Sequence, residues 1–208
     1  MRSTTVAITQ ADQHNFKKIA VLTFITLLSV AFLLMFTPSA SAQSAAEKQS
    51  IRQVQALLNS AKKTGGSQSG LTSVVKRHFA VGTWVNALLG KQKSKFSGGQ
   101  LSEFRRLFPA YIAKQYSQQF SGSGGGGGEV TGSRTVRGDV LVTTKIPAKN
   151  RTFTVVWRMR VIGGKPRVID YSTGGISNIV LRRTEFQSKV KQSGAQSLNN
   201  FLKRFIGA

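Results

Sequence analysis

Apolar residues recur at helical spacing in the first half of the chain. Between residues 45 and 63 the apolar positions follow a period of three to four, and Gly65 and Gly66 end the pattern. Shorter stretches at residues 71–79 and 84–89 repeat the period, and Gly90 suits a helix end. A longer stripe follows Ser97, which stands three residues before Gln100 as in a capping box. This half of the chain is therefore predicted to be helical.

The period changes to two in the second half. Residues 129–135, 140–146, 153–162 and 167–173 alternate between apolar and polar, and short Gly-, Pro- and Asn-containing segments separate them. Turns this short predict an antiparallel meander of about four strands. Ser177 can cap a further helix to about residue 192, Gly194 interrupts it, and a final amphipathic helix follows. The pattern predicts an α+β fold with the helices packed on one face of the sheet.

A Gly/Ser tract at residues 121–128 separates the two halves. Such a composition is typical of a flexible connector. It lacks the Gly-Lys-Ser/Thr of a phosphate-binding loop, and no apolar strand precedes it. We therefore interpret it as a loop within one domain.

The N-terminus has the pattern of a secretory signal peptide. Lys17 and Lys18 precede an uncharged apolar run over residues 19–36, which Pro38 and a small-x-small Ala-Ser-Ala sequence ending at Ala42 follow. Cleavage after Ala42 would leave one domain, residues 43–208, in the periplasm. An uncleaved anchor helix is the alternative, because the run approaches the length of a membrane span. The stretch before Lys17 is longer than a signal peptide needs and is consistent with a misassigned start.

The chain is strongly basic, with 30 Lys and Arg against 7 Asp and Glu. Residues 43–208 keep 27 basic and 6 acidic residues. Such an excess is typical of nucleic-acid binding, but in an exported protein it favours anionic headgroups or acidic partner proteins. A generally basic, solvated surface is the remaining interpretation. The chain has no cysteine, so its stability depends on packing alone.

Residues suited to catalysis are scarce. The segment 43–208 contains a single histidine, His78, whose place at a predicted helix end suggests an interaction with the helix dipole. A triad could be assembled only from His78, Ser177 and Asp170, and no local motif supports it; we expect Asp170 to accept turn donors or pair with arginine. Neither an enzyme, a metal site nor another cofactor is therefore expected. Large apolar side chains are plentiful instead, which fits either a dense core or a core that opens into a cavity.

The C-terminal region resembles a known family signature. It combines an aromatic strand at residues 155–160, a strand ending in Asp170-Tyr171, a Gly-x-Ser turn at Gly175 to Ser177, and a helix with Arg182, Arg183 and Phe186. The helices ending at Gly90 and starting at Ser97 agree with it. The sequence thus resembles the MlaC, or toluene-tolerance, family over about residues 51–205.

The resemblance implies a periplasmic, non-enzymatic carrier of phospholipid, part of an ABC transport system that supports outer-membrane lipid asymmetry. Its implied partners are an inner-membrane ABC transporter complex and an outer-membrane lipoprotein complex, and no nucleic acid. A related branch, HpnM, is associated with hopanoids, so a hopanoid is the alternative cargo. A basic polyanion- or nucleic-acid-binding module is the competing class, with Arg158 and Arg160 on one strand face as its best support.

Alternation along residues 153–162 predicts which side chains face the lipid, because successive residues point to opposite faces of a sheet. The wholly apolar face, which also includes Val161, is expected to line the cavity opposite the Ser97 helix. The predicted lipid-binding residues are Trp84, Leu88, Phe104, Phe108, Tyr111, Ile112, Phe153, Val155, Trp157, Met159, Ile176 and Val180.

Overall fold

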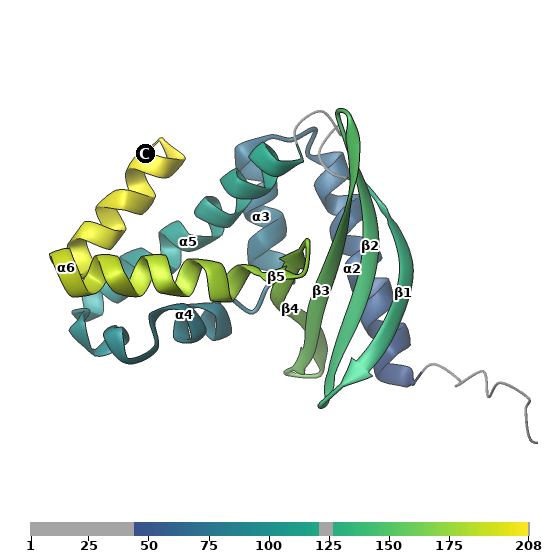
Figure 1. Cartoon of the computed structure of the whole chain (residues 1–208), viewed down its shortest axis with the longest axis horizontal. Coiled ribbons are helices and arrows are strands. Elements are labelled where there is room, and N and C mark those ends of the chain that lie inside the picture. The colour runs from purple at the N-terminus through teal and green to yellow at the C-terminus, as the bar shows by residue number, and fades with distance from the viewer. Residues whose placement is uncertain (1–43, 121–126, 208) are drawn as a thin grey trace, which may run out of the picture. The chain divides into compact units, whose positions relative to one another are not determined.

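The computed structural model describes residues 44–120 and 127–207. These residues form an α+β domain in which four α-helices and a short 3-10 helix precede a five-stranded sheet, and one long helix follows it (Figure 1). The predicted signal peptide, residues 1–42, and most of the Gly/Ser tract lie outside the described residues. The fold class agrees with the prediction.

Helices α2, α3 and α5 of the first half begin at serine side-chain caps, and α4 begins without one. Helix α2 (Ala45–Lys63) starts with a capping box in which Ser44 and Glu47 satisfy each other's backbone N–H groups. Helix α3 (Gln68–His78) begins after Ser67 and leads into α4 (Val81–Leu89). After the 3-10 helix η1 (Gly90–Lys95), the predicted capping box of Ser97 and Gln100 starts α5 (Gly98–Gln119).

The sheet is an antiparallel meander in the order β1-β2-β3-β4-β5. Its strands are β1 (Glu129–Val136), β2 (Asp139–Ala148), β3 (Arg151–Ile162), β4 (Lys165–Thr173) and β5 (Ile176–Ser177). The prediction of about four strands missed β5. This strand has two residues and pairs only with Ser172 and Thr173, so it is too short to show an alternating pattern.

The last helix, α6 (Asn178–Ile206), begins at the N-cap Ser177 as predicted. Its two halves were predicted as separate helices, and they form one element with a kink at Gly194. Gly194 has φ 80° and ψ 169°, a backbone conformation that glycine adopts readily and other residues do not. The predicted interruption of the helix at Gly194 is therefore confirmed as a kink, although no loop separates the two halves of α6.

Helix α2 packs across the sheet and contacts strands β1 to β4. Helices α3, α5, α4 and α6 pack on one another, and α4 and α6 also reach β4. One continuous apolar core joins both groups of helices to the sheet. Within residues 44–120 and 127–207, no helix has both the length and the apolar composition needed to cross a bilayer.

Candidate functional site

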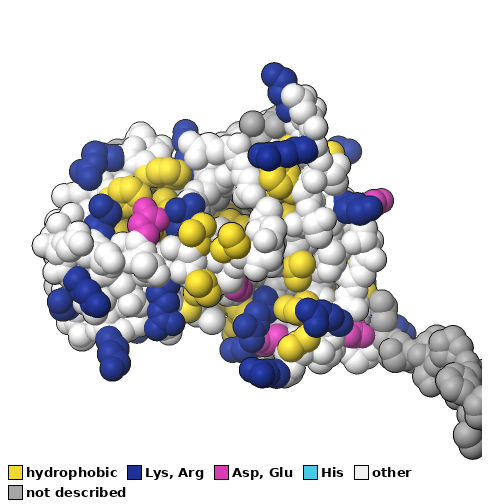
Figure 2. All heavy atoms as spheres, in the orientation of Figure 1, with side chains coloured by type: hydrophobic (Ala, Val, Ile, Leu, Met, Phe, Trp, Pro, Cys, Tyr) yellow, Lys and Arg dark blue, Asp and Glu magenta, His cyan; other side chains and the backbone are white. Residues whose placement is uncertain are grey.

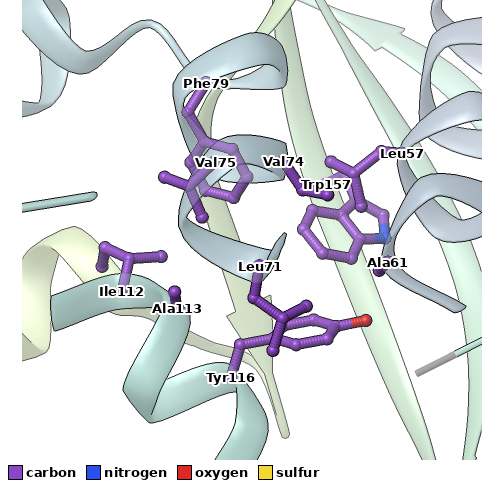
Figure 3. A pocket seen from close by; sticks show the side chains of 10 residues that line it. All are labelled: Leu57, Ala61, Leu71, Val74, Val75, Phe79, Ile112, Ala113, Tyr116 and Trp157. Carbon is purple, nitrogen blue, oxygen red and sulfur yellow. The ribbon is translucent and has the colours of Figure 1, made fainter. Parts of the chain in front are cut away.

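A small apolar void lies where α2, α3, α5 and β3 meet. Its volume is about 20 Å³, and Figure 3 shows side chains from all four elements around it. All of the lining residues are apolar or aromatic and buried: Leu57, Ala61, Leu71, Val74, Val75, Phe79, Ile112, Ala113, Tyr116 and Trp157. The void thus lies among core side chains, although it is not fully closed.

Two alanines help to explain why the space is empty. Ala61 on α2 and Ala113 on α5 are 1% and 0% exposed, and each contributes only a methyl group to the wall. Protein cores normally fill such positions, because an empty space removes dispersion contacts. Apart from the Tyr116 hydroxyl, the side chains around the void give water little to bond, so the void favours an apolar occupant.

Trp157 forms the sheet side of the void in a fixed orientation. Its indole Nε1 donates to Thr144 Oγ1 at 2.9 Å, and the Thr144 hydroxyl donates to the carbonyl of Val155 at 3.2 Å. Phe79 meets the indole edge to face, with ring centroids 6.4 Å apart. The only polar atom of the indole is therefore satisfied, and the ring presents an apolar surface to the void.

The junction between α3 and α4 is attached to the sheet. Val168 of β4 accepts two hydrogen bonds on its carbonyl, each 3.0 Å long, from the backbone N–H of Ala80 and the indole N–H of Trp84. Phe79 also forms an isolated parallel bridge with Val168. The C-terminal end of α3 is thereby held against β4. At its other end, the turn from α2 contains Gly65 and Gly66, both with positive φ and with open space around them.

The sequence was compared with models of protein families. The model described as MlaC protein matches residues 48–204, which is most of the chain. The protein belongs to the MlaC family.

Among solved structures, this MlaC-family protein is similar to a phospholipid-binding protein from Ralstonia solanacearum, which was solved in complex with a phospholipid. The TM-score is 0.64 at 14% sequence identity, and the match covers 76% of this chain and 97% of the other. At this identity the likeness concerns the fold. No match was found among curated proteins.

Of the residues predicted to bind lipid in this MlaC-family member, Ile112 and Trp157 line the void. The others that are fully buried lie in the adjoining core: Trp84, Leu88, Phe104, Phe108, Tyr111, Val155 and Met159. Phe153 is half-buried and packs edge to face on Phe120. Ile176 and Val180 lie on the surface, 61% and 64% exposed, because β5 and the first turn of α6 are not covered by another element. Lipid contact by these residues stays a prediction.

Sequence reasoning did not select most of the wall. The lining residues that were not predicted as site residues are Leu57 and Ala61 of α2, Leu71, Val74 and Val75 of α3, Phe79 directly after α3, and Ala113 and Tyr116 of α5. Most of them belong to apolar helical stripes that were visible in the sequence. The period of a stripe identifies a buried face, but it does not show which other element that face contacts.

His78 does not have the role predicted for it at a helix end. It is 3% exposed, and its ring Nδ1 lies 3.1 Å from the side-chain amide nitrogen of Gln53. Burial, together with the positive charges of Arg77 and Arg167, lowers the pKa of His78 to about 4. The imidazole is therefore neutral near pH 7, and a neutral ring has no net charge to interact with the helix dipole.

Asp170 organises the turn that leads into α6. Its carboxylate accepts hydrogen bonds from the backbone N–H groups of Tyr171 and Ile179 and from the Ser177 hydroxyl. Burial raises the pKa of Asp170, whereas these donors act to lower it. The expectation that Asp170 accepts turn donors is confirmed. Ser177 Oγ also accepts from the Val180 N–H as a helix cap, and His78 bonds Gln53 instead of joining these two residues.

Proposed function

We propose that this protein binds phospholipid by taking the acyl chains into the void between α2, α3, α5 and β3, and that its role is binding and transport without catalysis. The observation that carries the proposal is the apolar void inside a MlaC-family fold. The similar Ralstonia solanacearum protein, described as phospholipid-binding, supports the choice of ligand. No polar side chain except the Tyr116 hydroxyl belongs to the lining, which suits hydrocarbon.

The void must expand to hold a lipid. Its volume of about 20 Å³ is far below the roughly 300–1,000 Å³ of ordinary ligand pockets. Each CH₂ group left in water costs about 0.8 kcal/mol, so two acyl chains of about sixteen carbons would lose roughly 25 kcal/mol if they stayed wet. Only nearly complete enclosure lets a carrier compete with a bilayer.

The expansion is expected to separate α3 from α2. Hydrogen bonds to Val168 hold the α3–α4 junction against β4. The opposite end of α3 is joined to α2 through Gly65 and Gly66, which have open space around them. The Gln68 side-chain amide at this end donates to the carbonyl of Ala110 on α5 at 2.7 Å, and the movement proposed here would break that bond. In this proposal α3 swings outward from its fixed C-terminal end, and the acyl chains enter between α2 and α3.

The sequence and the family support a proposed cellular role. The predicted signal peptide, residues 1–42, supports a periplasmic location. In our proposal the protein is the carrier of an ABC transport system and shuttles phospholipid between an inner-membrane complex and an outer-membrane lipoprotein complex. This role would contribute to the lipid asymmetry of the outer membrane.

A transfer assay tests the carrier activity. Donor vesicles contain a fluorescent phospholipid with a non-exchangeable quencher, and acceptor vesicles contain neither. We expect transfer at a rate that rises in proportion to protein concentration, because each molecule encloses and releases lipid in turn. An equal amount of an unrelated basic protein provides the control for charge-driven vesicle aggregation.

Two results of this assay would contradict the proposal. The first is a transfer rate no higher than with the control protein. The second is transfer of a hopanoid analogue that leaves phospholipid in the donor vesicles, which would identify the cargo as a hopanoid.

A further inference from the structure

The tip of the β3–β4 hairpin exposes two branched apolar side chains. Val161 and Ile162 are 49% and 39% exposed. Val161 was predicted to face the helices, and this was wrong, because β3 extends to the turn at Gly163 and Gly164 beyond the part of the sheet that the core covers. The tip therefore presents apolar surface to solvent at the end of a long hairpin.

The turn at the tip has open space around its two glycines. Apart from each glycine and its chain neighbours, no described atom lies within 4 Å of the position that a Cβ would take at Gly163 or Gly164, and both glycines have positive φ. The β1–β2 turn, at Arg137 and Gly138, lies at the same end of the sheet, since β2 begins at Asp139 and Val140 pairs with Met159 near the end of β3. We call this end of the sheet the hairpin face.

The hairpin face has more basic than acidic residues. It carries six cationic residues, Arg134, Arg137, Arg158, Arg160, Lys165 and Arg167. The acidic residues at or beside it are Asp139, Asp170, which is the register partner of Arg158, and Glu47, which accepts a hydrogen bond from the Thr135 hydroxyl at 2.9 Å. The Asp139 side chain is 2% exposed and forms ion pairs with Arg158 and Arg160 at 2.5 and 2.6 Å. Figure 2 shows hydrophobic side chains directly beside Lys and Arg side chains at this end of the sheet.

The ion pairs hold two arginines near the apolar tip. Burial by itself raises the pKa of Asp139, but hydrogen bonds from Arg160 and Arg158 and their charges bring the pKa below its ordinary value. Asp139 is therefore ionised at neutral pH and neutralises one positive charge. Both arginine side chains stay about half exposed, 45% and 49%, so they can still meet an anion from solvent.

We propose that the hairpin face binds the surface of an anionic bilayer, with Val161 and Ile162 inserted at the headgroup level and the surrounding cations on lipid phosphates. Charge complementarity selects this partner, because cations around exposed apolar side chains match the anionic and apolar layers of a membrane interface. A projecting tip with space around it can enter a fluid surface without needing a shaped receptor. The inference goes beyond the proposed function, since none of these residues lines the void.

Vesicle binding tests the proposal with the purified protein expressed from its full-length sequence. Cosedimentation is measured with phosphatidylcholine vesicles that contain none or about a third phosphatidylglycerol. We expect binding that rises with phosphatidylglycerol and weakens with salt, because the contacts are screened over about 8 Å at physiological ionic strength. Intact mass of the purified protein shows whether residues 1–42 are present.

Two double variants weaken the face without touching its ion pairs. Arg137→Asn with Lys165→Gln removes two charges and is expected to weaken binding on the order of 25-fold, about fivefold per cation. Asparagine suits position 137, where φ is 51°. Val161→Ser with Ile162→Ser removes the apolar contact and is expected to weaken binding on the order of tenfold.

Each variant has a matched control elsewhere on the surface. Lys91→Gln with Lys95→Gln removes the same charge from η1, and Leu181→Ser removes an exposed apolar side chain from α6. All control variants are expected to bind vesicles within about twofold of the parent. Control variants that lose as much binding as the hairpin variants would show that general charge or hydrophobicity is responsible, and would overturn the proposal.

A site-specific probe locates the contact directly. The chain has no cysteine, so Ile162→Cys and Leu181→Cys each give one site for an environment-sensitive fluorophore. Anionic vesicles are expected to shift the emission of the label at 162 to the blue and leave the label at 181 unchanged. An unshifted label at 162, or no vesicle binding at all, would refute the proposal and leave an acidic protein as the partner of this face. If the hairpin face does not bind vesicles but organic extracts of the same protein contain lipid, the proposed function is still supported.

Discussion

Ala113→Leu is expected to weaken phospholipid affinity roughly 60-fold, and so to lower the lipid content of the protein, while the protein stays folded. Ala113 lines the void from α5 and is fully buried, so the added carbons enter the space that the acyl chains need. Three displaced CH₂ equivalents at about 0.8 kcal/mol each correspond to about 2.4 kcal/mol of lost lipid binding. Leucine also suits a helix interior. Occupancy is measured as lipid phosphorus per protein, and stability as the thermal midpoint.

The control is Ala110→Leu, on the same helix but outside the void lining. It adds the same side chain at a half-buried position, so we expect its lipid occupancy to match that of the parent protein. An Ala113→Leu protein that keeps full occupancy would show that lipid does not enter this void. A loss of folding by Ala113→Leu is resolved by Ala61→Val, a smaller addition on the α2 side of the same space.

Between pH 7 and pH 4, the free energy of unfolding of the parent protein is expected to fall by about 3 kcal/mol more than that of His78→Gln. The pKa of His78 falls from 6.5 in the unfolded chain to about 4 in the folded protein. The unfolded chain therefore takes up a proton first, and the free energy of unfolding decreases as pH falls from about 6.5 to about 4. A shift of this size corresponds to about 3 kcal/mol. Urea unfolding at pH 7, 5.5 and 4 measures it.

Other groups change the pH profile of both proteins equally. Hydrogen bonds from Lys203 and other donors lower the pKa of Glu103, and Arg160 and Arg158 lower that of Asp139, so both carboxylates also lose stabilising contacts in acid. The difference between the parent protein and His78→Gln isolates the histidine. Parallel pH profiles for the two proteins would mean that His78 remains protonatable near its ordinary pKa in the folded state.

The fold could be predicted from the sequence because its signals are local. Capping residues Ser97 and Ser177 begin helices at the expected positions, and Gly194 interrupts α6 where the helical period breaks. Alternation along β3 correctly placed Val155, Trp157 and Met159 in the core. The strand β5 was missed, since two residues cannot display a period.

The site could be predicted only in part because it depends on contacts between distant segments. Ile112 and Trp157 were found from the faces of α5 and β3, but α2 and α3, which supply half of the wall, carry stripes that would fit any core. Ala61 and Ala113 contribute to the site because their small side chains leave space that larger residues would fill. A composition rich in large apolar side chains does not show where such a space lies. Val161 was misplaced because alternation predicts a face and not the point where the covering helices stop.

The most direct test of lipid binding is mass spectrometry of organic extracts from the protein purified without detergent. Our account predicts one principal lipid class, phospholipid with two acyl chains, in an amount approaching one molecule per protein, and much less from Ala113→Leu prepared in the same way. Extracts that contain no stoichiometric lipid, or equal amounts from Ala113→Leu, would contradict the claim that the void between α2, α3, α5 and β3 is a phospholipid site.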